Sequence, residues 1–415
     1  MRREDFRKIV LYLTGQTITM FGSALVQYAI TWHITLTTKS GLMLMISTLC
    51  GFLPQLIITP FAGVWADRLN RKRLIMLADG MIAVATALLA LLFMMGYDDL
   101  WLLFAISAVR SLGSGIQAPS VGAFLPEIAP NEQLMRVNGV NASIQGAMML
   151  VAPVAAGGLL EFMSIDAIFW IDVLTAFVGI GFLAFIKSVR PRTAQNGNNK
   201  AGVFGDIMSG LRYVAKTKWL LQFNGVYLFM SLMFGPVIFL TPLMVARSFG
   251  DSTTLLVIHE VVFAAGMTLG GLTVGIFAKK FRNKVIMVGI ACAAFGIETL
   301  IMGFSPNFVF YSAVMASMGM TIPYVNSGAM TMFQTKVQPE YLGRVMSING
   351  IIATTTMPLS MVIFGPISDS VSVETLLIIT GALMTLMMIP TFMLKDMIAA
   401  GEPAREELAI TSQTP

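Results

Sequence analysis

Ionisable side chains within apolar stretches are the residues of this chain with the most distinctive chemistry. Arg110 lies in the stretch AISAVRSLGSG, and carboxyl groups occupy similarly apolar surroundings at Asp172, Glu260 and Glu298. A charge away from water needs an opposite charge or a polar partner, and a carboxyl group can also exchange its proton. These residues therefore indicate either proton transfer or structural pairs with a hydroxyl or backbone group.

A second polar feature is the stretch GVWADRLNRKRL, which begins at Gly63. Asp67 lies there beside Arg68, Arg71 and Lys72, so an anion is placed within a basic cluster. If the preceding apolar stretch is a helix, Asp67 lies near its C-terminus, where the helix dipole disfavours a negative charge. We therefore expect Asp67 to have a partner elsewhere in the fold.

The composition places most of these residues in a membrane. Hydrophobic residues make up 56% of the chain, charged residues only 12%, and the mean hydropathy is +0.77. Soluble domains carry about 25% charged residues. The chain has two cysteines and two histidines, without the spacing of metal ligands. We expect an integral membrane protein with no catalytic residues, no metal and no cofactor.

Apolar stretches long enough to cross a bilayer, which takes about 20 residues, recur along the whole chain. The predicted spans are 9–36, 43–66, 74–96, 100–126, 138–161, 166–187, 219–246, 253–278, 284–304, 307–333, 343–367 and 373–394. With a cytoplasmic N-terminus, every Lys and Arg except Lys39, Arg110 and Arg247 falls on the inside. This bias follows the positive-inside rule, so both termini are predicted to be cytoplasmic, and the basic balance needs no nucleic acid to explain it.

The two halves of the chain resemble each other. The pattern E-x-L-x-R-V occurs from Glu132 to Val137 and again from Glu340 to Val345, 208 residues later. Such a recurrence indicates two similar halves in parallel orientation. We predict an all-α membrane protein of twelve helices in two pseudo-symmetric six-helix bundles, residues 1–189 and 218–396. A cytoplasmic linker with a short interfacial helix covers 190–217, and a cytoplasmic tail covers 397–415.

These features resemble the major facilitator superfamily. The stretch after the second span matches its motif G-x-x-x-D-R-x-x-R-[KR] at Gly63, Asp67, Arg68, Arg71 and Lys72. Within the superfamily, RSLGSGIQAPS, HEVVFAAGMTLGGL and PEYLGRVMSINGII are similar to drug:proton antiporters of the macrolide-efflux type. The stretch APVAAGG is a degraded form of an antiporter motif and supports antiport only weakly.

The resemblance implies a secondary exporter that moves a hydrophobic or amphipathic small molecule out of the cell in exchange for protons, by alternating access. The proton gradient supplies the energy. Lysophospholipid and siderophore carriers share this fold and are the alternative functions. A membrane-embedded enzyme or a channel is more remote, since neither catalytic clusters nor a filter sequence is present. We expect a monomer in a bacterial inner membrane whose partners are the substrate, protons and the bilayer.

The resemblance also assigns roles to residues. Asp67 would form a cytoplasmic latch with the start of the eleventh span, just after Arg344, although the loop could serve topology alone. Arg110 resembles an arginine that antiporters use in proton coupling, with Glu260 and then Asp172 as the acids. Spans one, four, seven and ten would line a central cavity. Their polar residues are Gln16, Thr19, Ser23, Gln27, Gln117, Asn224, Tyr227, Ser231, Thr321 and Tyr324.

Overall fold

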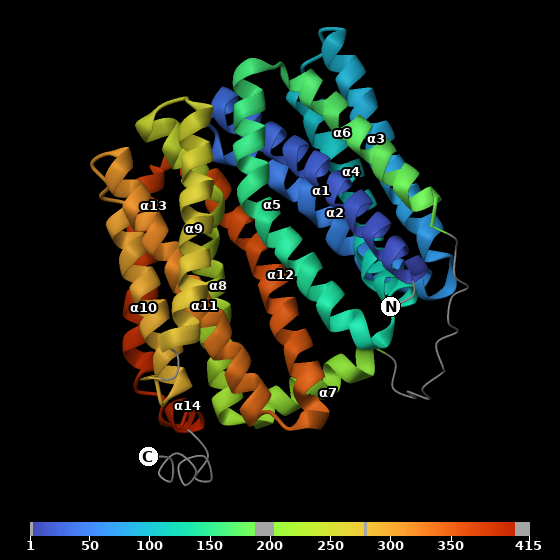
Figure 1. Cartoon of the computed structure of the whole chain (residues 1–415). Coiled ribbons are helices and arrows are strands. Elements are labelled where there is room, and N and C mark those ends of the chain that lie inside the picture. The colour runs from blue at the N-terminus through green and yellow to red at the C-terminus, as the bar shows by residue number, and fades with distance from the viewer. Residues whose placement is uncertain (1–2, 187–202, 278–279, 403–415) are drawn as a thin grey trace. The chain divides into compact units, whose positions relative to one another are not determined.

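A computed structural model describes residues 3–186, 203–277 and 280–402. Helices make up nearly all of the described chain, which contains no strand. The polar part of the predicted linker, residues 190–202, and most of the predicted tail lie outside the described residues. A short helix, α7 (Val203–Lys216), covers the rest of the predicted linker, and its place at the membrane interface stays a prediction. It packs against α12 and α8 and lies crosswise to α12 in Figure 1.

The described helices fall into two compact units: the first six spans together with Asp251–Val257 form one, and the remaining helices form the other. The helices of the first unit are α1 (Arg3–Thr38), α2 (Gly41–Arg68), α3 (Arg71–Met94), α4 (Leu100–Ile128), α5 (Leu134–Phe162) and α6 (Ile165–Ala184). The second unit contains α7, α8 (Lys218–Met244), a π-helical turn (Val245–Phe249), most of α9 (Thr253–Phe277), α10 (Lys284–Met302), α11 (Phe308–Lys336), α12 (Pro339–Ser370), α13 (Val373–Thr391) and α14 (Lys395–Ala400).

Within the described residues, twelve helices are long and apolar enough to cross a membrane. They coincide with the twelve stretches predicted from the sequence and confirm the membrane fold. Helices are the expected form because hydrocarbon offers no partner for backbone N–H and C=O groups, which an α-helix satisfies internally.

The same packing pattern occurs inside each unit. In the first unit, α1 packs along α5 and α6, and α3 packs against α4 and α6. In the second, α8 packs along α12 and α13, and α10 packs against α11 and α13. The repeat extends to the helix starts, because the Asn70 side chain caps α3 and the Asn283 side chain caps α10. The internal repeat read from the sequence is therefore a structural repeat.

Glycines allow close packing at equivalent places in the two units. A Cβ atom on Gly115 of α4 would lie 2.9 Å from the carbonyl oxygen of Gln55 in α2. A Cβ atom on Gly270 of α9 would lie 2.4 Å from the carbonyl oxygen of Met320 in α11. Small residues let membrane helices approach until their backbones touch, where dispersion forces hold them together. Helix α2 therefore packs closely against α4, and α9 packs closely against α11.

Candidate functional site

A buried ion pair joins α4 and α6 in the first unit. Arg110 Nη1 donates to Asp172 Oδ2, and only 8% of the Arg110 side chain and none of the Asp172 side chain is exposed. Both residues were singled out from the sequence, and the structure places them in contact. A buried arginine needs an opposite charge or a polar partner, and Asp172 is that partner for Arg110.

Two hydroxyl residues complete the surroundings of this pair. Thr86 of α3 donates to Asp172 Oδ2 at 3.1 Å and also lies within hydrogen-bond distance of Arg110 Nη1. Ser23 of α1 donates to Asp172 Oδ1 at 3.3 Å, while its backbone carbonyl accepts from Arg110 Nη2 at 3.3 Å. Side chains of four helices, α1, α3, α4 and α6, thus meet at this carboxylate.

A second acid lies in the same unit. Asp79 of α3 is 3% exposed and accepts a hydrogen bond from Gln117 Nε2 of α4. Among the described residues it has no cationic partner. It borders a small cavity of about 10 Å³, a volume that suits a single water molecule. The lining residues of this cavity are Tyr12, Gly15, Gln16, Thr19, Ile75, Asp79, Gly179 and Leu183.

Asp79 is not among the residues singled out from the sequence. The signal was available, since Asp79 is the only charged residue within the apolar stretch predicted as the third span. The predicted residues Gln16, Thr19 and Gln117 lie at or beside Asp79. Three of the predicted substrate residues therefore adjoin a buried acid, and their role in the substrate cavity stays a prediction.

Arg71 and Lys72, at the start of α3, bind to other helices of the first unit. Arg71 donates from Nη1 to Glu127 Oε1 at 3.0 Å and from Nε to the Ala66 carbonyl at 2.8 Å. Lys72 Nζ donates to the carbonyl oxygens of Ala184 and Ile186 at 2.8 and 2.7 Å. The last carbonyl oxygens of a helix have no intrahelical donor, and the Lys72 ammonium supplies one at the C-terminus of α6. Glu127, at the end of the fourth span, was also missed in the sequence.

Unlike Arg71 and Lys72, Asp67 has a side chain that is largely exposed to solvent. Its side chain is 68% exposed, and the Arg71 guanidinium, 3.8 Å away, is its ion-pair partner within the described part of the unit. Arg68 is exposed, and a Cβ atom added to Gly63 would meet nothing within 4 Å. Asp67 is therefore available for a partner, and the cytoplasmic latch remains a prediction.

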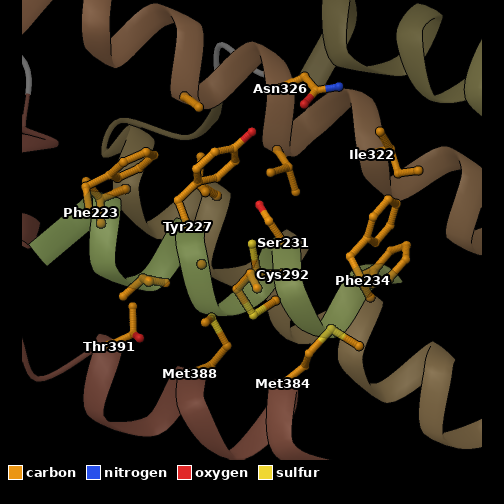
Figure 2. Close-up of a pocket in the computed structure, with 18 of the residues that line it drawn as sticks. Phe223, Tyr227, Ser231, Phe234, Cys292, Ile322, Asn326, Met384, Met388 and Thr391 are labelled. Atoms are coloured by element: carbon orange, nitrogen blue, oxygen red, sulfur yellow. The ribbon is translucent and has the colours of Figure 1, made fainter. Parts of the chain in front are cut away.

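The second unit contains an apolar cavity of about 240 Å³, shown in Figure 2. Helices α8, α10, α11 and α13 form its walls, with Met397 of α14 added, and none of the lining residues is charged. The lining is rich in aromatic and sulfur-containing side chains: Phe223, Tyr227, Phe234, Phe295, Met230, Met384, Met388, Met397 and Cys292. Two predicted substrate residues, Tyr227 and Ser231, belong to this lining and point from α8 toward α11.

Other predicted residues lie outside both cavities. Asn224 is buried and donates to the Leu220 carbonyl at 2.8 Å, while its side-chain oxygen finds no partner among the described residues. Thr321 donates to Glu298 Oε2 at 3.1 Å, so this predicted cavity residue is hydrogen-bonded to an acid of α10. Tyr324 is half-buried, and the exposed Gln27 donates to Thr31 on its own helix.

Glu260 is a half-buried residue of α9. The described part of the chain provides it with neither a hydrogen bond nor an ion pair. The preceding residue, His259, is buried, with Nδ1 2.8 Å from the hydroxyl oxygen of Tyr311. The described residues contain no cluster of three or more metal-ligating side chains.

Comparisons with known proteins agree with this architecture. A family model described as Major Facilitator Superfamily matches residues 12–354 and 227–409. Macrolide efflux protein A of Streptococcus pyogenes is 30% identical over 373 residues, which cover 89% of this chain and 91% of that protein. Multidrug efflux pump Tap of Mycobacterium bovis is 21% identical over 377 residues and covers 89% of each chain.

Solved structures show the same fold. A POT family transporter in complex with a thioalcohol-conjugated peptide matches with a TM-score of 0.71 at 9% identity, covering 93% of this chain and 96% of that one. A bacterial homologue of the iron transporter ferroportin, in its inward-facing state, matches with a TM-score of 0.69 at 14% identity, covering 93% and 98%. With its twelve spans, its internal repeat and these matches, the chain belongs to the major facilitator superfamily, a family of membrane transporters and not of enzymes.

Proposed function

We propose that this protein exports hydrophobic or amphipathic small molecules, macrolides among them, in exchange for protons. The cargo class is supported by the similarity to macrolide and multidrug efflux proteins over most of the chain. Transport proceeds by alternating access, in which the cargo site opens first to the cytoplasm and then to the outside, with both termini cytoplasmic.

The proposal of proton coupling rests on the buried charged residues of the first unit. Arg110 and Asp172 compensate each other, while Asp79, buried in the same bundle, has an amide partner and no cation among the described residues. An acid held within a membrane bundle without a cation marks a site for loading and releasing a proton. Gln117 donates to the Asp79 carboxylate and fixes its orientation.

Glu260 is the second proposed proton carrier. It shares with Asp79 the lack of a cationic partner in the described chain, and it lies in the stretch that resembles the antiporter branch. Asp172 is less suited to carry the proton alone, since protonating it would leave Arg110 as an uncompensated buried charge. We propose instead that Arg110 and Asp172 change their pairing when the proton is bound.

The test uses purified protein in liposomes and radiolabelled erythromycin as the cargo. An imposed pH gradient should drive accumulation in the wild type, and a protonophore should abolish it. Asp79→Asn and Glu260→Gln should each reduce gradient-driven accumulation while keeping counterflow, the exchange of labelled for unlabelled cargo that needs no gradient. The control is Asp166→Asn, an acid in the first turn of α6. Wild-type accumulation that ignores the gradient would refute antiport, and a fully coupled Asp79→Asn variant would reject that residue.

A further inference from the structure

The apolar cavity of the second unit and the small cavity beside Asp79 in the first lie at equivalent positions of the internal repeat. On α1 the first cavity is lined by Tyr12, Gly15, Gln16 and Thr19, and on α8 the second is lined by Phe223, Val226, Tyr227 and Met230. Each residue of the second set follows its counterpart by 211 residues, the same offset that separates the last residues of these two spans, Thr38 and Phe249.

The correspondence holds on two further helix pairs. Ile75 and Asp79 of α3 correspond to Val288 and Cys292 of α10, with the offset of 213 that separates the first residues of these helices. Leu183, next to the end of α6, corresponds to Thr391 of α13, with the offset of 208 between their helix starts. Three helix pairs therefore place the two cavities at the same site in each unit.

The chemistry of the two sites has diverged. The first holds the carboxylate of Asp79 in a space of about 10 Å³, and the second encloses about 240 Å³ among apolar side chains, with Cys292 where the acid would be. We propose that the cavity of the second unit binds an uncharged, apolar arm of the exported molecule, while its counterpart in the first unit serves the proton. This assignment rests on the proposed export function and names the part of the cargo that is recognised.

The size of the cavity determines how much of the cargo enters it. Pockets that hold a whole drug-sized molecule measure about 300–1,000 Å³, whereas an apolar cavity of about 150 Å³ holds a ring the size of benzene. A space of about 240 Å³ lies between these values. It accommodates a substituted ring or a short branched chain, and the remainder of a macrolide must lie outside it.

Polar groups on the wall restrict what the arm can carry. Tyr227, Ser231 and Asn326 lie along the α8–α11 side of the cavity, and the described residues offer none of their side chains a hydrogen bond. A hydroxyl, ether or ester oxygen on the arm would satisfy them, whereas an ammonium or carboxylate would find no counter-ion. Three methionines on the other walls, Met384, Met388 and Met397, can adjust to arms of different shape.

A single reporter thiol tests the assignment. Cys50 and Cys292 are the only cysteines, so replacing both with alanine and introducing Ser231→Cys places one thiol on the cavity wall. The matched control introduces Ser347→Cys instead, at an exposed position of α12 in the same unit. Each variant is reconstituted and labelled with N-ethylmaleimide. Protection is measured with erythromycin and with desosamine, the charged amino sugar of erythromycin without its apolar ring.

Erythromycin at about ten times its Kd should slow labelling of the thiol at position 231 about tenfold, because an occupied cavity excludes the reagent. Desosamine should not slow it, and labelling of the control thiol should be unaffected by either compound. Failure of erythromycin to protect, or failure of the reagent to reach position 231, in a variant that still exports erythromycin would overturn the proposal. Protection by 1-myristoyl-lysophosphatidylcholine in place of erythromycin would also overturn it and would assign the cavity to lipid.

A second pair of variants tests the cavity through transport. Ala329→Leu adds bulk inside the cavity, and Ala313→Leu adds the same bulk at an exposed position of the same helix, α11. Ala329→Leu should raise KM for erythromycin about tenfold with little change in kcat, which is the signature of lost cargo binding. An unchanged KM would contradict binding of the cargo in this cavity.

The two proposals fail in different ways. Protection of position 231 in a protein that does not respond to the pH gradient would refute antiport and leave the binding site standing. Gradient-driven export without protection of position 231 would refute the binding site and leave antiport standing.

Discussion

Arg110 and Asp172 form an ion pair between α4 and α6 in which the carboxylate is fully shielded from solvent and the guanidinium nearly so. Ser23 and Thr86 donate to the same carboxylate, so each oxygen has a donor. An isolated charge at such a site would be costly, and the paired arrangement is what permits an arginine at mid-span.

Asp172→Asn should strongly destabilise the protein, because it leaves the Arg110 charge without its partner. Breaking a buried pair from one side costs about 3–5 kcal/mol. The double variant Arg110→Met with Asp172→Leu removes both charges and should melt at a higher temperature than either single variant. Thermal unfolding in detergent, followed by circular dichroism, measures this, and a single variant as stable as wild type would contradict the buried pairing.

Asp67→Asn should slow transport without weakening cargo binding, because the proposed latch controls the conformational change and not the cargo site. We expect kcat to fall about tenfold with an unchanged KM, since conformational coupling of this kind is worth about 1–3 kcal/mol. Asp98→Asn, at an exposed acid in another loop, is the control. Wild-type turnover of Asp67→Asn would leave the motif with a purely topological role.

Lys72→Met should lower stability, whereas Arg68→Met should not, although both changes remove one positive charge from the same α2–α3 junction. Lys72 donates to two carbonyl oxygens at the C-terminal end of α6, those of Ala184 and Ile186, and Arg68 is exposed. Hydrogen bonds from charged groups contribute about 1.5–3 kcal/mol. Equal melting temperatures for the two variants, measured side by side in the same detergent, would show that the contact to α6 contributes nothing.

Gly270→Ala and Gly271→Ala should have opposite effects although the residues are adjacent. A Cβ atom at Gly270 would lie 2.4 Å from the Met320 carbonyl oxygen and must push α9 away from α11, whereas at Gly271 it would meet nothing within 4 Å. Overpacking costs about 1–3 kcal/mol, while alanine improves helix propensity by up to about 1 kcal/mol. The yield of monodisperse protein and its melting temperature report both effects, and a tolerated Gly270→Ala would contradict the close α9–α11 packing.

The twelve spans, the loop motif and the internal repeat could be predicted from the sequence because each depends on local properties. Span length depends on consecutive apolar residues, and the repeat is visible as E-x-L-x-R-V at two places in the chain. The short helix α7 was also predictable, since its apolar residues recur at helical spacing.

The candidate sites required the tertiary structure. The sequence identifies Arg110 and Asp172 as unusual, but 62 residues separate them, and only the rotation and packing of α4 and α6 bring them into contact. The same holds for Gln117 and Asp79, and for the pairing of Tyr227 and Ser231 with methionines of α13 around one cavity. A hydrophobic pattern fixes which residues enter the membrane because partitioning is local and additive. It does not fix which side chains meet there, because that depends on how helices rotate and pack against one another.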